Sequence, residues 1–136
     1  MGVDPVAFAQ AARTFVGVPF RLHGRDPCSA LDCVGLVVAA FAKAGGAATV
    51  PTGYQLRNLR IGAFLPALEE TGFREVAAAP ETGDLLLVRP SAGQFHLMIV
   101  VPQGQLVHAH AGLGRVVETP GPLAWRIERQ WRLPAN

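Results

Sequence analysis

The chain has 136 residues and a net charge of +2, a size typical of one domain that can bury a core without metals or disulfides. Its basic residues are scattered singly, without the positive stripe of nucleic-acid binders, which argues against nucleic-acid binding. The longest apolar run, residues 34–42, is far shorter than the ~20 residues that cross a bilayer. Since the N-terminus also lacks the pattern of a signal peptide, we expect one domain over residues 1–136 without membrane insertion.

Two helices are predicted in the N-terminal third of the chain. Asp4 is a predicted N-cap with Pro5 at the first helical position, and the apolar residues that follow recur at helical spacing. Residues 17–30 are rich in Gly and Pro and are predicted to form a loop. Asp32 then caps a second, buried helix, which ends before Gly45.

The rest of the chain changes from helical to strand pattern. Residues 52–72 have a helical pattern interrupted at Pro66, which predicts two short helices or one broken helix. Strands are predicted at residues 85–88, 94–101, 105–110, 115–119 and 125–133. Helices followed by antiparallel strands predict an α+β fold.

Asp32 and Cys33 open the second helix at the mouth of an otherwise apolar segment. Unpaired backbone N–H groups and the positive end of the helix dipole favour a thiolate in a first turn, so we expect a lowered pKa for Cys33. A thiolate is the reactive form of cysteine, which makes Cys33 a candidate nucleophile; a buried structural cysteine is the alternative. Cys28 is predicted to be free and noncatalytic.

A nucleophilic cysteine needs a base, and the base needs a group that orients it. His96 lies inside an apolar predicted strand, and His108 and His110 lie in the next one. If residues 102–104 form the connecting loop, the register places His96 on the same sheet face as the other two histidines. We therefore predict a loop of odd length or a bulge, with both His108 and His110 within reach of His96.

These motifs resemble the NlpC family of bacterial cell-wall cysteine endopeptidases. The resemblance rests on GVPFRLHGRDP, LDCVGLV, GDLLLV, HLMIVV and LVHA, spread over residues 15–109. It implies a reduced papain-like fold, with N-terminal helices packed on a C-terminal antiparallel sheet. In that family the base is followed twelve residues later by a polar residue that is often His, and this spacing selects His108 over His110.

The resemblance implies Cys33 as the nucleophile, His96 as the base and His108 as the orienting residue. The backbone N–H of Cys33 would contribute to an oxyanion hole. The implied substrate is the peptide stem of peptidoglycan, which this family commonly cuts between D-glutamate and diaminopimelate. Neither a cofactor nor a metal is implied.

The predicted substrate-binding residues include the positions where the chain departs from the family. Phe20 replaces the usual Tyr, Val34 the usual Ser after the nucleophile, and His23 a Gly of the preceding loop. Asp32 and His110 complete the predicted set. Two alternatives stay open, because His23 also suits a solvent-facing loop residue and His110 an alternative orienting residue.

No export signal is predicted, so we expect a domain made in the bacterial cytoplasm and carried to the wall in a phage tail or phage-like particle. The apolar fraction of 50% agrees with a surface covered by structural proteins of such a particle. Cytoplasmic recycling of wall peptides is the competing route. Two other functions remain possible: an inactive tail or scaffold component with this fold, and a zinc module built on Cys33, His96, His108 and His110, although the close-spaced ligand pairs of structural zinc sites are missing.

Overall fold

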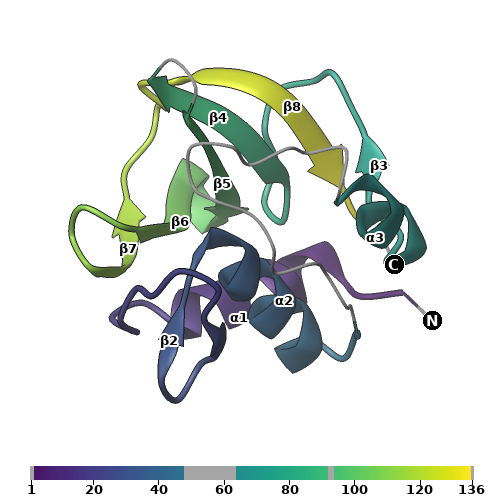
Figure 1. Ribbon diagram of the computed structural model, residues 1–136. Coiled ribbons are helices and arrows are strands. Elements are labelled where there is room, and N and C mark those ends of the chain that lie inside the picture. The colour runs from purple at the N-terminus through teal and green to yellow at the C-terminus, as the bar shows by residue number, and fades with distance from the viewer. Residues whose placement is uncertain (1, 48–63, 92–93, 136) are drawn as a thin grey trace.

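The computed structural model describes residues 2–47, 64–91 and 94–135, and Figure 1 shows its helices and strands. The helices are α1 (Pro5–Thr14), α2 (Cys33–Lys43) and α3 (Leu65–Glu70), with a 3₁₀ turn at Pro102–Gly104. The strands are β1 (Arg25–Asp26), β2 (Ala30–Leu31), β3 (Arg74–Glu75), β4 (Leu85–Ser91), β5 (Gln94–Val101), β6 (Gln105–His110), β7 (Arg115–Thr119) and β8 (Arg126–Arg132).

Both N-terminal helices begin where the sequence predicts. The Asp4 carboxylate accepts a hydrogen bond from the Ala7 N–H at 2.9 Å, and the Asp32 carboxylate accepts one from the Gly35 N–H at 2.7 Å. These caps satisfy backbone donors that the first turn of a helix leaves without a partner. The two helices pack against each other below the sheet (Figure 1).

The sheet has six strands in the order β3-β8-β4-β5-β6-β7, and its pairs are antiparallel. This arrangement confirms the predicted α+β fold, with the helices of the N-terminal part on the sheet of the C-terminal part. Val101 pairs with Gln105, which confirms the loop of residues 102–104. The ladder between β5 and β6 runs only to the pair Ile99 and Val107, although both strands continue past it within the described residues.

The sheet buries apolar side chains on both faces. One face carries Leu85, Leu87, Leu97 and Ile99 against α1 and α2, and we call it the helix face. The other carries Leu86, Val88, Met98, Val100 and Leu106, packed by Leu123, Trp125 and Ile127. We call it the histidine face, because His96 pairs with Val88 and alternation along β5 places its side chain beside that of Met98.

Two short strands, β1 and β3, differ from the sequence-based expectations. The predicted loop at residues 17–30 contains β1, which pairs with β2 through Asp26 and Ala30. β3 was not predicted, because a two-residue strand has too few positions to show a period of two. The helix α3 agrees with the second of the two short helices predicted over residues 52–72, and Pro66 lies in its first turn, where its missing N–H costs no hydrogen bond. The helix predicted over residues 52–63 lies outside the described residues.

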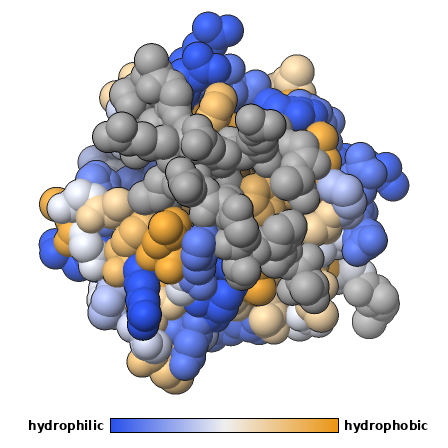
Figure 2. Space-filling model, viewed as in Figure 1, coloured by the Kyte–Doolittle hydropathy of each residue, from blue (hydrophilic) through white to orange (hydrophobic). Residues whose placement is uncertain are grey.

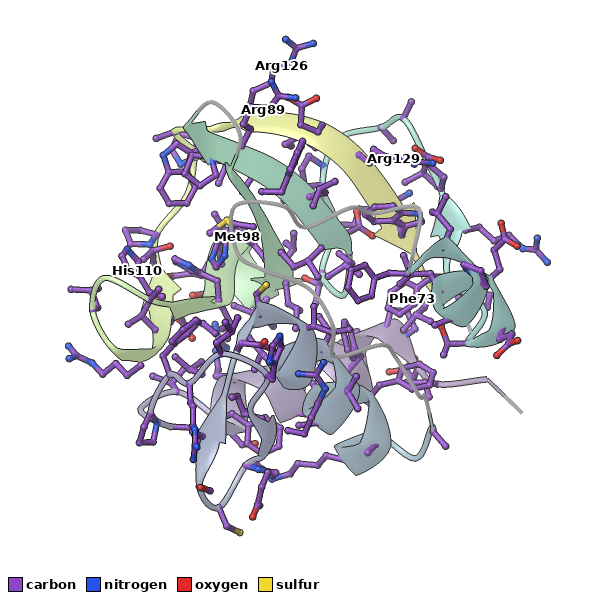
Figure 3. All side chains as sticks on the ribbon, viewed as in Figure 1. Phe73, Arg89, Met98, His110, Arg126 and Arg129 are labelled. Atoms are coloured by element: carbon purple, nitrogen blue, oxygen red, sulfur yellow. The ribbon has the colours of Figure 1, made fainter. Side chains whose placement is uncertain are left out.

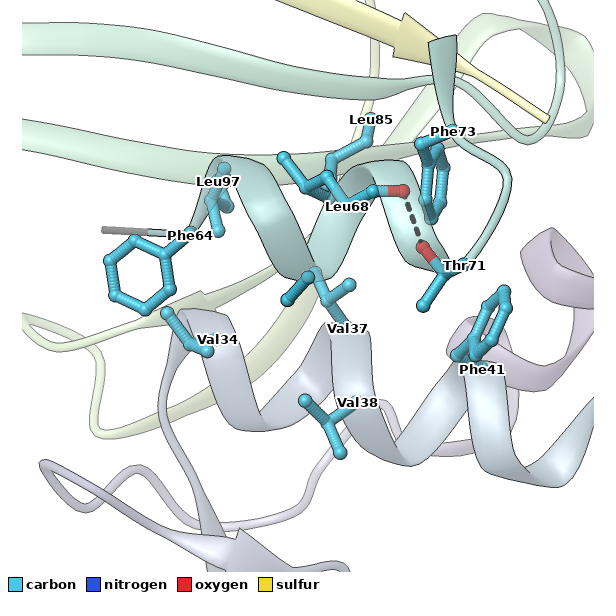
Figure 4. A pocket seen from close by; sticks show the side chains of 11 residues that line it. Val34, Val37, Val38, Phe41, Phe64, Leu68, Thr71, Phe73, Leu85 and Leu97 are labelled. Atoms are coloured by element: carbon cyan, nitrogen blue, oxygen red, sulfur yellow. Dashed lines mark hydrogen bonds between the residues drawn. The ribbon is translucent and has the colours of Figure 1, made fainter. Parts of the chain in front are cut away.

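Helix α3 closes over α2 and the sheet. Figure 4 shows the small apolar cavity between them, about 40 Å³ in volume. Leu68 of α3 and Phe64, the residue before this helix, line the cavity on one side. Val34 and Val37 of α2 line it on the other. No helix in the described ranges is long and apolar enough to cross a membrane.

Candidate active site

Cys33 lies at the first position of α2 with none of its surface exposed. The backbone amides of Leu97, Val34 and Cys33 itself lie close enough to its sulfur to lower the pKa of the thiol. The N–H of Val100 bonds to Asp84 on the β4 side at 2.9 Å, and bonding directions alternate along an antiparallel strand, so the Leu97 N–H points toward β6. The sulfur therefore lies near an amide that would bond to β6 if the ladder continued, at the point where β5 and β6 separate.

The structure contradicts the expected lowering of the Cys33 pKa. Burial raises the pKa of this thiol to about 12, and the nearby negative charge of Asp32 raises it further. The three nearby backbone amides lower the pKa but do not compensate for these effects. The thiol is thus neutral at pH 7, because desolvation of a fully buried sulfur outweighs the favourable helix N-terminus.

The buried carboxylate of Asp32 joins α2 to the segment before it. Besides capping Gly35, it accepts hydrogen bonds from the His23 N–H at 2.8 Å and from the Arg25 guanidinium at 3.0 Å. A carboxylate with no exposed surface requires such partners. The backbone approaches closely here, since a Cβ at position 35 would collide with the Gly24 carbonyl oxygen. This contact explains the glycine in the DCVG motif.

His96 and His108 form a hydrogen-bonded pair on the histidine face. The Nε2 of His96 lies 2.8 Å from the Nδ1 of His108, and the two rings meet edge to face with centroids 5.0 Å apart. This contact confirms that the two imidazoles share a sheet face. The indole of Trp125 stands edge-on to both, with centroid distances of 6.3 Å to His96 and 6.2 Å to His108.

Both imidazoles are neutral at pH 7. Burial lowers the pKa of His96 to about 3, and the charges of His108 and His110 lower it further. Burial, followed by the charge of His110, lowers the pKa of His108 to about 4. Burial thus disfavours a thiolate paired with an imidazolium at this site.

A pocket of about 280 Å³ opens beside the histidines. His96, His110, Phe20 and Trp125 line it, together with Phe95 and the Ala109–Gly112 segment. Figure 2 shows apolar side chains at the surface where β6 and β7 lie above the 17–31 segment, and Leu22 and Leu113 are among the exposed apolar residues. The described walls of the pocket are thus mostly apolar, and the imidazoles of His96 and His110 add polar groups.

The predicted substrate-binding residues divide into two groups. Phe20 and His110 line this pocket, and Figure 3 shows His110 at the end of β6. The other three are absent from its described lining. His23 is an exposed residue with a left-handed φ of 65°, Asp32 is fully buried, and Val34 is 3% exposed and faces the cavity under α3. Their role in substrate binding stays a prediction, with Asp32 and Val34 buried and His23 exposed.

Two features of the site were missed from the sequence. Trp125 was predicted only as the first residue of a strand, whereas it precedes β8 and contacts both imidazoles. The Leu97 amide carries no signal in the sequence, because its availability depends on where β5 and β6 separate.

Both cysteines are free; Cys28 is exposed and Cys33 is buried. Within the described ranges, no group of three or more His, Cys, Asp or Glu residues is arranged to hold a metal ion. The four residues considered for a zinc module therefore provide no such set in this part of the chain.

Comparison with known proteins identifies the class. The model of the NlpC/P60 family matches residues 17–126, so the chain belongs to this family of cell-wall cysteine peptidases. It is 26% identical over 107 residues to Protein P54 of Enterococcus faecium, spanning 79% of this chain but only 18% of that protein.

Solved structures share the fold. RipB, a peptidoglycan hydrolase of Mycobacterium tuberculosis, superposes with a TM-score of 0.64 at 24% identity, over 97% of this chain and 65% of that one. NlpC1 of Trichomonas vaginalis gives a TM-score of 0.69 at 17% identity, over 98% of this chain and 45% of that one. Both superpositions support helices packed on a six-stranded antiparallel sheet.

Proposed function

We propose that residues 1–136 form one cysteine endopeptidase domain that hydrolyses the peptide stems of bacterial peptidoglycan. In this proposal Cys33 is the nucleophile, His96 the base and His108 the residue that orients the base. The observation that carries it is the position of the Cys33 sulfur at the Leu97 amide, directly after His96 in β5, with the His96 ring bonded to His108.

The chemistry follows from the hydrogen bonds and protonation states of these groups. The Nε2 of His96 is hydrogen-bonded to His108, so the Nδ1 of His96 remains to accept the thiol proton. Because thiol and imidazole are both neutral at rest, this proton moves to His96 as the sulfur attacks the scissile carbonyl carbon. The N–H of Cys33 stabilises the developing oxyanion.

The same imidazole completes the reaction. His96 gives its proton to the leaving amine nitrogen as the C–N bond breaks, which leaves a thioester on Cys33. A water molecule then attacks the thioester, His96 accepts the proton of this water, and the acid product leaves as the thiol regains a proton. No cofactor is required for these steps.

The proposed bond lies between D-glutamate and diaminopimelate, as is common in the family. The pocket beside His96 supports a peptide substrate, since aromatic side chains of Phe20, Phe95 and Trp125 line it. Phe20 supplies no hydroxyl to the substrate, unlike the usual Tyr, and His110 adds a polar group to the wall beside His96.

Delivery in a phage tail or phage-like particle remains a proposal from the sequence alone. Neither the family nor the proteins named above are described as parts of such a particle. Recycling of wall peptides in the cytoplasm would use the same chemistry on released peptides.

Digestion of defined muropeptides followed by mass spectrometry tests the proposal. We expect the wild-type chain to split the D-glutamyl–diaminopimelate bond, Cys33→Ala to lose at least about 10⁴-fold in rate, and Cys28→Ser to match the wild type. Cleavage by Cys33→Ala would remove Cys33 from the mechanism. A folded wild type that cuts none of the peptides would favour the inactive scaffold component.

A further inference from the structure

The hydrogen bonds of the histidine pair continue to a residue on β7. The Nε2 of His108 lies 3.4 Å from the Oγ1 of Thr119. Thr119 pairs with Leu106 across the ladder of β6 and β7, so it stands diagonal to His108 on the histidine face. Two successive hydrogen bonds thus connect His96 to His108 and His108 to Thr119, three residues on neighbouring strands.

A neutral imidazole has one N–H and one lone pair, which leaves two directions for this chain. In the first, His96 donates through Nε2 to His108, and His108 donates through Nε2 to the Thr119 oxygen. In the second, Thr119 donates to His108, and His108 donates through Nδ1 to His96. Only the first direction leaves the Nδ1 of His96 without a proton, free to act as a base.

The surroundings of Thr119 offer few other hydrogen-bond partners for the Nε2 of His108. A pocket of about 300 Å³ borders His108 and Thr119, with apolar walls that include Met98, Leu106 and Leu123. Apart from two histidines and the Trp125 indole, Thr119 carries the only polar side chain among its described lining residues. His108 is 1% exposed, so without this oxygen its Nε2–H would be left unsatisfied at a considerable energetic cost.

We propose that Thr119 is a positioning residue: its hydroxyl accepts the Nε2–H of His108 and so holds His96 in the tautomer whose Nδ1 is free to take a proton from Cys33. This inference rests on the proposed function for its catalytic meaning. The tautomer itself, however, is measurable without any substrate.

The substitution Thr119→Val tests the inference, because valine keeps the shape and the strand preference of threonine but removes the oxygen. Thr119→Ser restores a hydroxyl. Thr71→Val is the matched control, since its hydroxyl donates to the Leu68 carbonyl at 2.7 Å, far along the chain from the histidines.

Imidazole ¹H–¹⁵N spectra of labelled protein at pH 7 report which ring nitrogen carries the proton. We expect Nε2–H on His96 and His108 in the wild type, Thr119→Ser and Thr71→Val, and a shift of His108 toward Nδ1–H in Thr119→Val. In muropeptide assays kcat should fall about tenfold or more in Thr119→Val with KM unchanged, and Thr119→Ser should recover most of it.

The two readouts separate this inference from the proposed function. An unchanged His108 tautomer in Thr119→Val, or Nδ1–H on His108 in the wild type, would overturn the role of Thr119 whether or not the chain cleaves peptides. Wild-type inactivity combined with the expected tautomer shift would leave Thr119 in this role and reject the peptidase.

Discussion

The two faces of the six-stranded sheet differ in how far their reactive groups are enclosed. On the helix face, Cys33 has no exposed surface, and the charge of Asp32 adds to the effect of burial. On the histidine face, His96 lies on a pocket wall and is bonded to a second imidazole. One face therefore keeps a thiol protonated and enclosed, whereas the other keeps a neutral base beside a space for substrate.

This difference shows how burial sets the chemistry on both sides of one sheet. Desolvation raises the pKa of an acid such as a thiol and lowers the pKa of a base such as imidazole. Both effects favour neutral partners, and the gap between about 12 for Cys33 and about 3 for His96 disfavours a preformed ion pair. Proton transfer must then accompany the attack of the sulfur.

The largest effect predicted from this comparison is a loss of kcat that separates the role of His108 from that of His110. Replacing His108 by Ala removes the hydrogen bond that orients His96, so kcat should fall about 10²-fold or more. His110→Ala should chiefly raise KM, because His110 lines the pocket. Steady-state kinetics with a defined muropeptide measures both, and an equal loss of kcat in the two variants would make His110 an orienting residue as well.

A smaller effect concerns the helix face. Asp32→Asn keeps an acceptor for the Gly35 N–H but loses the charge that faces Arg25, so the free energy of unfolding should fall by about 2 kcal/mol. The same change removes a cause of the raised Cys33 pKa. Alkylation of Cys33 should therefore begin at a lower pH than in the wild type.

Asp4→Asn is the matched control, because Asp4 caps α1 in the same way. Urea unfolding of both variants gives the stability change, and alkylation in a Cys28→Ser background follows a single thiol. A Cys33 alkylation profile that is identical in Asp32→Asn and Asp4→Asn would show that the Asp32 charge does not act on the thiol.

A further prediction concerns how stability depends on pH: its acid side is assigned to the histidine face and its alkaline side to the helix face. Below pH 6.5 the unfolded chain takes up protons on His96 and His108, while the folded chain resists until about pH 3 to 4, so stability falls as the pH falls. Above pH 9 the unfolded chain loses the Cys33 proton, while the folded chain keeps it to about pH 12, so stability falls as the pH rises.

Melting temperatures across pH test this assignment. In His96→Gln the melting temperature should fall less steeply toward acid pH. In Cys33→Ala it should fall less steeply toward alkaline pH. Each variant serves as the control for the other side. An alkaline side that is unchanged in Cys33→Ala would mean that the folded chain releases this proton as readily as the unfolded chain.

Local rules predicted much of the fold. The caps at Asp4 and Asp32 are short-range patterns, and they start the helices where expected. The three-residue loop and the alternation of side chains placed His96 and His108 on one face, because a strand has a period of two. These features depend on neighbours in the chain, which the sequence displays directly.

The corrections concern contacts that residue types alone do not reveal. The short strands β1 and β3 pair through backbone groups, which leave little trace in residue type. The burial of Asp32 depends on the close approach of the 21–31 segment to α2, which residue types alone do not reveal. Trp125 reaches the imidazoles because the segment between β7 and β8 crosses the histidine face.

By itself, the sequence determined which reactive side chains are present and how they are spaced: a cysteine at a helix start and histidines on successive strands. Only the tertiary structure decided their protonation, because desolvation depends on every element that packs around a group. It also decided that the sulfur meets β5 where the ladder with β6 ends, since strand separation is a property of the whole sheet.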